Sequence, residues 1–263
     1  MKTLQKVFGR IGGLCLLLCT VSLSANEIPK LAIIIDDLGY RLDQGKRVVA
    51  LPGPVVCAVL PDTPRGKQLA NLAHRQGKEV LLHLPLQSMD QVETPEGAIG
   101  LDTNRAEFDR LLHEAVALTP NLTGINNHKG SLVTRHPGHM RWLMEYMRER
   151  DDLLFVDSYT THHSVALQIA NEMGVPALRR DVFLDPDKEP ATVQREFERA
   201  IRLAQKNGSA IAIGHPYPAT LALLERELPR LADYGVELVA LSRLLEASSA
   251  SSVQPIPDPD SSQ

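Results

Sequence analysis

The sequence contains little cysteine. Of its three cysteines, Cys15 and Cys19 lie among the first 25 residues, which leaves Cys57 as the single cysteine of the rest of the chain. A single cysteine cannot form an internal disulfide, so a hydrophobic core has to hold the fold together. Because Cys57 also lies within an apolar run, its thiolate is a poor candidate for a nucleophile. These features exclude a small disulfide-stapled domain and disfavour a cysteine hydrolase.

Positive charge and two common enzyme motifs are also missing. The formal net charge is −4, whereas proteins that bind nucleic acid present basic surfaces. There is no G-x-S-x-G motif of a serine hydrolase and no glycine-rich loop that would cradle a phosphate. Aromatic residues make up 4% of the chain, which is few for a protein that stacks sugar rings on aromatic side chains. The sequence therefore argues against nucleic acid as a partner and against these two classes of enzyme.

The N-terminus predicts a secretory signal peptide, residues 1–25. Three basic residues precede an apolar run over residues 11–21, which is too short to span a bilayer comfortably. Small residues then lead to a cleavage position near Asn26. An uncleaved N-terminal anchor is the alternative. We expect a cleaved signal, a periplasmic or otherwise exported protein, and no stable transmembrane segment after cleavage.

The C-terminus has a different composition. From Ser248 to Gln263 the chain is rich in serine and proline and has no periodic apolar positions. Such a segment cannot bury a core, so residues 248–263 are predicted to be a disordered tail. Residues 28–247 contain neither a short internal repeat nor a linker, and we expect them to form one domain.

Short apolar runs alternate with longer stretches of helical period between residues 28 and 247. Most of the runs are continuously hydrophobic, which is typical of parallel strands covered on both faces. The predicted strands are Leu31–Asp37, Val55–Leu60, Glu79–Pro85, Thr123–His128, Leu153–Ser158, Ala177–Leu184, Ser209–His215 and Val236–Leu241. Helices are predicted over Arg105–Leu118, Ser164–Met173 and Ala191–Lys206.

Repeated strand–helix units predict an α/β fold with a parallel sheet. About eight strands suit a (β/α) barrel of seven or eight units, and a doubly wound open sheet is the competing architecture. One connection is unusually long, because the residues between Leu84 and Thr103 show neither helical nor strand period. Long loops after barrel strands often carry function, and a simple surface excursion is the equal alternative.

Polar residues stand at the points where the predicted strands end. The run that starts at Leu31 stops at two neighbouring aspartates, Asp36 and Asp37, whose charges repel unless a cation or hydrogen bonds neutralise them. Because the carboxyl ends of parallel strands lie on one face, we expect these side chains to meet the others that end strands. Those others are His83, His128, Asp157, Arg180, Asp181 and His215.

Three of these strand ends carry a histidine. A lone histidine in such a place is more often structural, but three histidines and a carboxylate pair on one face favour a functional cluster. Imidazole and carboxylate together are an ordinary ligand set for zinc. The other six histidines are interpreted as structural or solvent-exposed; they are His74, His113, His136, His139, His162 and His163.

Five motifs, in their order along the chain, resemble the divergent polysaccharide deacetylase family, a distant branch of the NodB-type carbohydrate esterases. The motifs are IIIDDLGY, HLPLQ, NNHKGS, FVDSYT and AIGHPYP, and the resemblance runs from about Pro29 to Leu245. It implies a distorted, NodB-like (β/α) barrel with a divalent metal at the strand ends, zinc being the expected ion.

The resemblance also implies roles for individual residues. Asp36 takes the place of the catalytic base, and Asp37 takes the place of a metal ligand. His83 matches a metal-binding histidine on the third strand, and His215 matches the histidine that acts as the acid.

The sequence departs from the family pattern at three points. The second histidine of an H-x-x-x-H motif is absent, so His128 is expected to replace it as a metal ligand from a different strand. The R-x-P-Y segment is replaced by NNHKGS, and the aspartate–tryptophan pair is not seen. Asp157, Arg180 and Asp181 are therefore expected only as outer partners of the site or as additional ligands.

Together these implications predict an exported, metal-dependent hydrolase. Its substrate would be an N-acetylated envelope glycan, peptidoglycan or a related polymer, from which it removes acetyl groups by activating water. Two alternatives stay open. One is a catalytically silent periplasmic protein that keeps the barrel and the metal site and binds a glycan or a partner. The other is a metal hydrolase that acts on a different acyl or amide bond.

Overall fold

The computed structural model describes residues 27–91, 93–150 and 152–252. The predicted signal peptide and residues 253–263 of the predicted tail lie outside these ranges, so both stay predictions. Within the described ranges, no helix is both long enough and apolar enough to cross a membrane.

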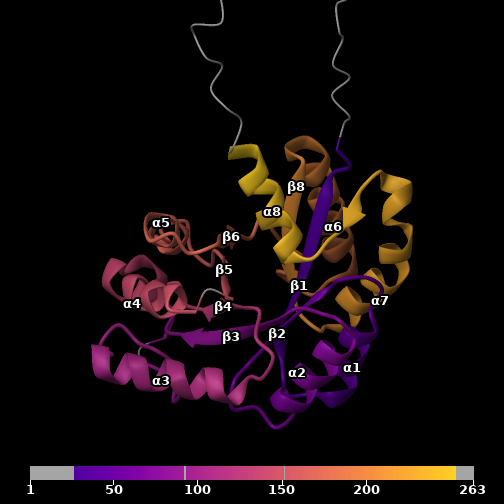
Figure 1. The fold of residues 1–263 in the computed structure, drawn as a ribbon. Coiled ribbons are helices and arrows are strands. Elements are labelled where there is room, and N and C mark those ends of the chain that lie inside the picture. Colours follow the sequence, from indigo (N-terminus) through magenta and orange to yellow (C-terminus); the bar gives the residue numbers. More distant parts are fainter. Residues whose placement is uncertain (1–26, 92, 151, 253–263) are drawn as a thin grey trace, which may run out of the picture.

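A parallel sheet forms the centre of the molecule (Figure 1). Its strands lie side by side in the order β6-β5-β4-β3-β2-β1-β8-β7, and the short strand β9 pairs with the start of β1. The strands are β1 (Lys30–Leu38), β2 (Val56–Val59), β3 (Val80–Leu86), β4 (Gly124–Lys129), β5 (Leu154–Asp157), β6 (Ala177–Arg179), β7 (Val182–Phe183), β8 (Ser209–Gly214) and β9 (Glu237–Leu238).

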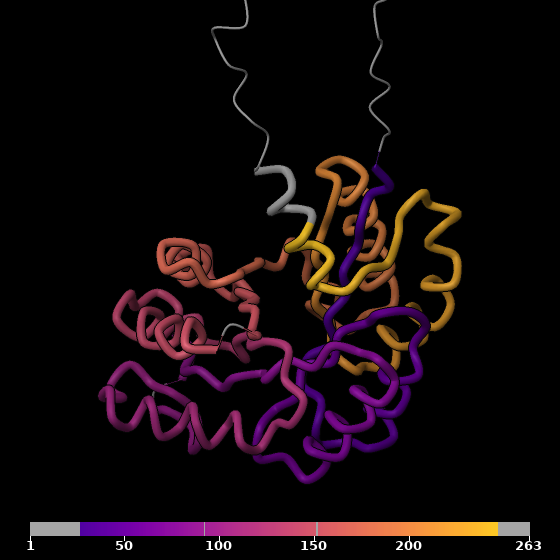
Figure 2. The backbone as a smooth tube through the Cα atoms, in the orientation of Figure 1, coloured from indigo at the N-terminus to yellow at the C-terminus, as the bar shows by residue number. Residues whose placement is uncertain are grey.

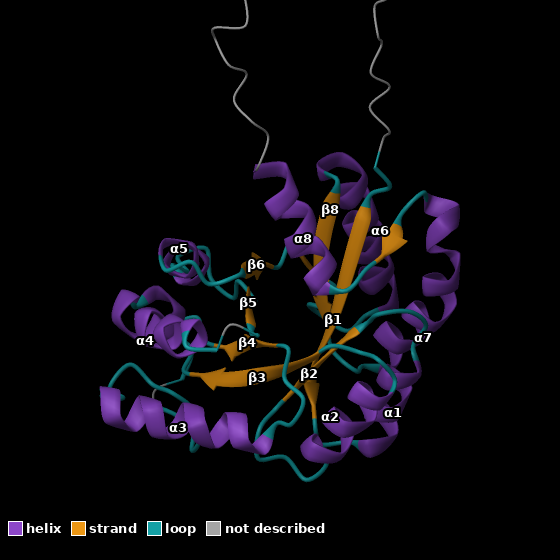
Figure 3. Cartoon of the chain, in the orientation of Figure 1, coloured by secondary structure: helices purple, strands orange, loops and turns teal. Residues whose placement is uncertain are grey.

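Helices lie around the strands (Figure 3). They are α1 (Leu42–Ala50), α2 (Gly66–Arg75), α3 (Arg105–Leu118), α4 (Pro137–Arg148), α5 (Ala166–Glu172), α6 (Pro190–Asn207), α7 (Pro218–Glu227) and α8 (Leu241–Ser252), with short 3-10 helices η1 (Val133–Arg135) and η2 (Leu228–Tyr234). Local signals set their ends. The Asn104 side chain accepts the backbone N–H of Glu107 at 3.1 Å and caps α3. Helix α6 begins at Pro190 and stops at Gly208, whose φ of 83° is left-handed.

Side chains alternate along β1 between two hydrophobic cores. Leu31 and Ile33 face outward and pack with residues of the surrounding helices, such as Phe197 of α6. Ala32 and Ile34 face inward and belong to a second core built from inward residues of β2, β3, β5 and β8. A sheet whose strands gather around a core of their own side chains is curled, as in a barrel. The predicted distorted (β/α) barrel, a single domain, is therefore confirmed, and the doubly wound open sheet is not the fold.

The barrel is distorted because β6 and β7 lie at opposite edges of the sheet. The single strand predicted over Ala177–Leu184 is wrong, since these residues form two strands. Between them, the backbone N–H of Arg180 donates to the Asp157 carbonyl of β5 at 3.0 Å, and that of Asp181 donates to the Ile211 carbonyl of β8 at 2.9 Å. The chain thus crosses from one edge of the sheet to the other at these two residues, and we call this crossing the seam.

Helix α8 covers the end of the barrel where the strands begin, and Figure 2 shows the two described chain ends near each other there. The Leu241 backbone N–H donates to Glu79 Oε2 at 2.8 Å, close to the start of β3. Leu241 and Leu244 complete the inner core. Helix α8 runs to Ser252, so it continues into the first residues of the segment predicted as a tail.

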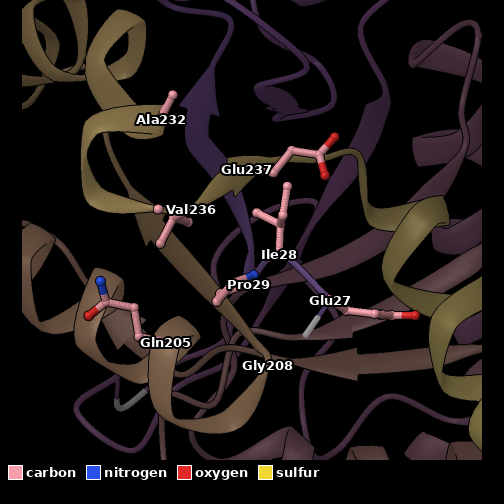
Figure 4. Close-up of a pocket in the computed structure, with 9 residues that line it drawn as sticks. Glu27, Ile28, Pro29, Gln205, Gly208, Ala232, Val236 and Glu237 are labelled. Atoms are coloured by element: carbon pink, nitrogen blue, oxygen red, sulfur yellow. The ribbon is translucent and has the colours of Figure 1, made fainter. Parts of the chain in front are cut away.

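A cavity of about 630 Å³ lies at this same end, beside the start of β1 (Figure 4). Its acidic side chains come from Glu27 and Glu237, and no histidine lines it. Chemistry in parallel barrels lies at the carboxyl ends of the strands. This cavity is therefore on the wrong side of the sheet to be the candidate site.

Candidate metal centre

The carboxyl end of β1 carries both aspartates of the predicted site. Strict alternation would point neighbouring side chains to opposite faces of the sheet. The pairing of β1 with β2 slips by one residue between Ile35 and Leu38, which is the signature of a β-bulge. Asp37 has a φ of 59°, a left-handed conformation that is uncommon for a residue other than glycine. The bulge turns Asp37 to the same face as Asp36, so both carboxylates reach the mouth of the barrel.

Two more left-handed residues stand at this mouth. Lys129, the last residue of β4, has a φ of 54°, and Tyr159, two residues after β5, has a φ of 49°. Such conformations persist only where the surrounding structure holds them, and they gather at functional sites. The three strand ends that carry them mark the region in which the polar side chains meet.

Asp37, His83 and His128 bring their donor atoms together. His83 Nε2 and His128 Nδ1 lie 3.3 Å and 3.0 Å from Asp37 Oδ1, and 3.1 Å from each other. The register of β3 and β4 explains the histidines: His83 lies opposite Asn126, and His128 is two residues further along on the same face. These three residues, which we call the triad, are the ones that we expected to bind metal from the sequence.

Asn126 sets the protonation of His83. Its Oδ1 lies 2.9 Å from His83 Nδ1, while its Nδ2 donates to Asp36 Oδ1 at 2.8 Å. Since Oδ1 can only accept, His83 carries its proton on Nδ1. The lone pair of a neutral His83 is then on Nε2 and faces Asp37. A histidine that ligates a metal needs this arrangement, with the other ring nitrogen donating to a fixed acceptor.

The triad fits a tetrahedral metal. Two ligands that are each about 2.0–2.1 Å from a zinc ion are about 3.3 Å apart in a tetrahedral site. The three observed separations of 3.0, 3.1 and 3.3 Å match one face of such a tetrahedron. Asp37 Oδ1 is also a buried oxygen that has no hydrogen-bond partner of accepted geometry among the described residues, which is rare unless something else binds it. The residues present therefore fit a divalent cation with three protein ligands.

Asp36 lies beneath the triad and is almost fully buried, with 3% of its surface exposed. Its Oδ2 is 3.6 Å from His83 Nε2. Burial raises the pKa of Asp36 above its ordinary value, even though the hydrogen bond from Asn126 and the nearby His83 and His215 act in the opposite direction. A carboxylate with a raised pKa takes up a proton more readily, which suits a base.

Asp37 is perturbed in the other direction. Burial alone would raise its pKa, but the neighbouring His128 and His83 hold the pKa of this carboxyl well below its usual range. Asp37 therefore stays ionised, as a ligand must. The two adjacent aspartates thus differ in protonation because of what each one touches.

His215 stands across the mouth from the triad, directly after β8. Its Nδ1 lies 2.8 Å from Asp185 Oδ1, and its Nε2 faces Asp37 Oδ2 at 3.7 Å. Asp185 also accepts the backbone N–H of His215 at 2.7 Å and the hydroxyl of Thr220 at 2.6 Å. Burial alone would lower the pKa of His215, but the hydrogen bond to Asp185 and the charge of Asp36 raise it overall. The hydrogen bond to Asp185 thus favours the cationic form of His215, and Nε2 is turned to the site.

The other predicted residues lie outside the triad. Asp157 accepts the backbone N–H of Tyr159 at 2.8 Å and the hydroxyl of Ser164 at 2.7 Å, so its oxygens are engaged in the loop after β5. Asp181 Oδ2 accepts the backbone N–H of Ile211 at 2.8 Å. Arg180 donates to backbone carbonyls of that same loop. All three residues lie around the seam. None of them belongs to the group of possible metal ligands.

Of the six remaining histidines, all but one are exposed, as expected. His74, His113, His136, His162 and His163 face solvent. His139 is buried, with Nε2 3.1 Å from the Thr103 carbonyl and Nδ1 2.8 Å from His136 Nδ1. Burial lowers the pKa of His139, which therefore has a structural, neutral role.

Two hollows flank Asp37 at the surface. A cavity of about 690 Å³ extends from Asp37 and His128 toward the long loop after β3 and helix α3. This loop folds back on the strand, since the Gln87 backbone N–H donates to the Ile99 carbonyl at 2.9 Å and the Ile99 backbone N–H donates to the Pro85 carbonyl at 3.0 Å. A smaller hollow of about 150 Å³ lies on the side of His215. The site is thus open to a ligand that is longer than a single sugar ring.

Sequence reasoning missed Asn126 and Asp185. Asp185 directly follows the predicted strand Ala177–Leu184, in the same kind of position as the histidines that were selected. Asn126 interrupts an apolar strand, where a buried amide needs a polar partner. The sequence thus marks both positions, but it does not indicate which histidine each side chain contacts.

Two curated proteins have closely related sequences. The protein YibQ of Escherichia coli (strain K12) is 40% identical over 216 residues, which are 82% of this chain and 67% of that protein. A protein of Haemophilus influenzae is 40% identical over 215 residues, which are 82% of this chain and 76% of that protein. Both are described as uncharacterized, so they extend the family without adding an activity.

A solved structure and a family model match nearly the whole domain. The crystal structure of an uncharacterized protein from Agrobacterium tumefaciens C58 superposes with a TM-score of 0.79 at 23% identity, covering 84% of this chain and 91% of the other. At that identity the likeness shows the fold. The model of a family described as divergent polysaccharide deacetylase matches residues 33–245, the span over which the sequence motifs are distributed.

Proposed function

The chain belongs to the divergent polysaccharide deacetylase family, and from this membership we propose that it is an exported, metal-dependent hydrolase that removes N-acetyl groups from an envelope glycan. The observation that carries the proposal is the convergence of Asp37, His83 and His128, with the buried Asp36 carboxylate and the His215 ring beside them.

The triad would hold the metal, and zinc is the ion that its nitrogen and oxygen donors favour. A divalent metal bound there would polarise the acetamide carbonyl and lower the pKa of a water molecule. The remaining work falls to this chain's own residues. Asp37 and the two histidines would hold the metal, and Asn126 keeps the Nε2 lone pair of His83 directed at the site.

Asp36 and His215 divide the proton transfers. Asp36 accepts a proton from the attacking water while the oxygen of that water bonds to the carbonyl carbon. The raised pKa of Asp36 supports this role. His215 donates the Nε2 proton to the amine nitrogen as the carbon–nitrogen bond breaks. Asp185 stabilises the cationic form of His215 and orients its ring, so the proton is available on the face that looks toward Asp37. The products are acetate and a free amino sugar.

The family and the surface beside Asp37 support the proposed substrate class. The cavity of about 690 Å³ is within the usual size of a ligand site and is bordered by the loop after β3. An N-acetylated polymer of the envelope, such as peptidoglycan, has the acetamide groups that this chemistry needs. The predicted signal peptide would deliver the protein to that polymer.

One experiment tests metal and activity together. The purified protein is assayed for zinc by elemental analysis and for acetate release from a panel of N-acetylated oligosaccharides and peptidoglycan. We expect about one metal ion per chain and release from at least one substrate, both abolished by a chelator and restored by added zinc. Full metal occupancy with no acetate from any substrate would support the catalytically silent binding protein instead. Release of another acyl group would support the third interpretation.

Export is tested separately. Residues 1–30 are fused to a reporter that is active only outside the cytoplasm, and the N-terminus of the mature chain is sequenced. We expect reporter activity and a mature chain that starts near Asn26. A full-length cytoplasmic product would overturn the export proposal and leave the metal site untouched.

A further inference from the structure

Another hollow, separate from the three described above, lies beside the seam and is lined by three arginines. It has a volume of about 470 Å³ and is formed by the loop after β5, the end of β6 and the outer side of α6. Its lining consists of Tyr159, Thr160, Thr161, His162, Arg179, Arg180, Asp181 and Arg199. We call this hollow the arginine pocket. A concentration of cationic side chains is notable in a chain whose net charge is −4.

The positive charge of the arginine pocket is only partly neutralised. Among the described residues, no carboxylate oxygen lies within 4.0 Å of a side-chain nitrogen of Arg179 or Arg180, whereas Arg199 pairs with Glu196 at 3.2 Å. Asp181 also lines the pocket, and one of its oxygens is engaged by the Ile211 backbone. Burial lowers the pKa of Arg180 even though Asp36 and Asp157 are near enough to oppose this. Of the three arginines, Arg179 and Arg180 therefore lack an ion-pair partner among the described residues, and Arg199 has one.

The pocket also offers groups that suit a sugar ring. The guanidinium of Arg179 lies 4.4 Å from the centre of the Tyr159 ring, which fixes this exposed arginine over an aromatic face. Thr161 and His162 add polar atoms at the rim. A planar guanidinium matches the two oxygens of a carboxylate. A sugar that carries a carboxylate would use both kinds of contact.

Hydrogen bonds connect the arginine pocket to the candidate metal centre. Arg180 donates to the Ser158 carbonyl at 2.6 Å and to the Tyr159 carbonyl at 2.8 Å. The Ser158 hydroxyl accepts from Asn126 Nδ2 at 3.3 Å, and the same amide nitrogen donates to Asp36. Ser158 is thus the only residue between Arg180 of the pocket and Asn126, which contacts Asp36 and His83 beside the triad.

We propose that the arginine pocket binds the carboxylate of an acidic sugar in the glycan substrate, so that the substrate class is an acidic, N-acetylated polysaccharide. The proposal rests on the proposed function for the identity of the ligand as a glycan. With a neutral polymer, Arg179 would remain without an anionic partner, and Arg199 would keep only its exposed pair with Glu196. In an acidic one, a carboxylated residue near the reacting N-acetyl sugar pairs with Arg179 and Arg199 and sets the register of the chain.

The test compares two tetrasaccharides that differ only in charge. One alternates N-acetylglucosamine with glucuronate, and the other is its carboxyl-reduced form, in which glucose replaces glucuronate. Affinities for the full chain are measured by isothermal titration calorimetry. We expect the acidic form to bind about ten-fold more tightly or better, as for the gain of a charge-assisted hydrogen bond. Arg179→Gln and Arg199→Gln should each abolish most of this preference.

Arg202→Gln is the matched control, because Arg202 is an exposed arginine on the same helix as Arg199 and lies outside the pocket. It should retain the preference. Equal affinity for the two tetrasaccharides, or an unchanged preference in both pocket variants, would overturn the proposal. Tighter binding of inorganic phosphate alone than of the acidic tetrasaccharide would also overturn it, in favour of a phosphate site.

Acetate release separates this proposal from the proposed function. Acetate release from neutral chitotetraose, without any preference for carboxylated substrates, would support the proposed deacetylase activity and overturn the proposed role of the arginine pocket. An arginine-dependent preference without acetate release from any oligosaccharide would keep the acidic-glycan site on a protein that does not hydrolyse it.

Discussion

Two histidines, His83 in the middle of β3 and His215 directly after β8, present the same atom to the same carboxylate. His83 Nε2 lies 3.3 Å from Asp37 Oδ1, and His215 Nε2 lies 3.7 Å from Asp37 Oδ2. They differ in what holds the opposite ring nitrogen. His83 Nδ1 bonds to the neutral amide of Asn126, whereas His215 Nδ1 bonds to the carboxylate of Asp185.

This difference supports the two proposed roles. A neutral acceptor fixes the tautomer of His83 and leaves a lone pair on Nε2 for a metal. An anionic acceptor stabilises a second proton, so that His215 has one to donate from Nε2. In the proposed function, the ring that binds the metal is therefore distinguished from the ring that donates a proton by the hydrogen-bond partner of its Nδ1 atom.

The largest expected effect comes from removing the base without disturbing the metal. Asp36→Asn keeps the size of the side chain, so metal occupancy should be retained while turnover falls by about 10²–10⁴, the usual contribution of a positioned acid–base group. Turnover and bound zinc are measured on the same preparation. If excess metal restores the activity of Asp36→Asn and not that of Asp37→Asn, the roles of the two aspartates are reversed.

Loss of a triad residue should act on the metal first. Asp37→Ala, His83→Ala and His128→Ala each remove one of three protein ligands, so zinc affinity should fall by more than about a hundred-fold, beyond the effect of an outer partner. Competition with a chelating dye measures the affinity. His162→Ala is the control, because that histidine is exposed after β5, and it should bind zinc as the wild type does. Three triad variants with unchanged zinc would show that the ligands lie elsewhere.

Replacing the partner of each histidine tests the comparison itself. Asn126→Ala frees the ring of His83 and should weaken zinc binding by about 10–100-fold. Asp185→Asn should leave zinc affinity unchanged, since it touches no triad residue. A loss of zinc affinity in Asp185→Asn that equals the loss in Asn126→Ala would erase the proposed division of roles.

Asp185→Asn should instead change the pH profile of activity. The wild-type pKa of His215 is raised by the Asp185 carboxylate, and the general acid works only while protonated. Without that charge the pKa of His215 falls, so the alkaline limb of kcat/KM against pH moves to lower pH. Profiles recorded at saturating zinc measure the shift. An alkaline limb that stays in place would mean that another group supplies the proton.

The smallest expected effect is on stability. Because the folded pKa of His215 lies above its ordinary value of 6.5, its charge stabilises the metal-free protein fully below about pH 6.5. This stabilisation is lost as the pH rises through the folded pKa. Urea unfolding should therefore show that His215→Gln loses about 1–2 kcal/mol more at pH 6 than at pH 9, comparable with one charge-assisted hydrogen bond. A loss that does not depend on pH would indicate that the ring contributes by packing alone.

Much of the candidate site could be found from strand ends alone. Asp36, Asp37, His83, His128 and His215 each end an apolar run, and parallel strands bring such ends to one face. What could not be found was the direction of the side chains. Two neighbours such as Asp36 and Asp37 point to opposite faces of a regular strand, and only the bulge in β1 brings them together.

The segment Ala177–Leu184 shows the same limit for the fold. It is an apolar run with a charged pair inside it, and by itself it is consistent with one strand. In the barrel it has to reach both edges of the sheet, and Arg180 and Asp181 carry the crossing through backbone bonds to β5 and β8. Hydrophobic period is a local property, whereas the choice of edge depends on strands that are distant in the sequence.

The apolar runs establish a parallel α/β fold and the residues that interrupt those runs, because strands that are buried on both faces are continuously hydrophobic. The choice of a barrel over an open sheet, and the contacts between the interrupting residues, depend on how distant segments pack together. Asn126 and Asp185 differ by one amide, and each selects the chemistry of a histidine that lies 43 or 30 residues away in the chain. Hydrogen bonds of a few ångströms between distant positions leave no periodic trace in the sequence, so the protonation of the site follows from the packing of the barrel.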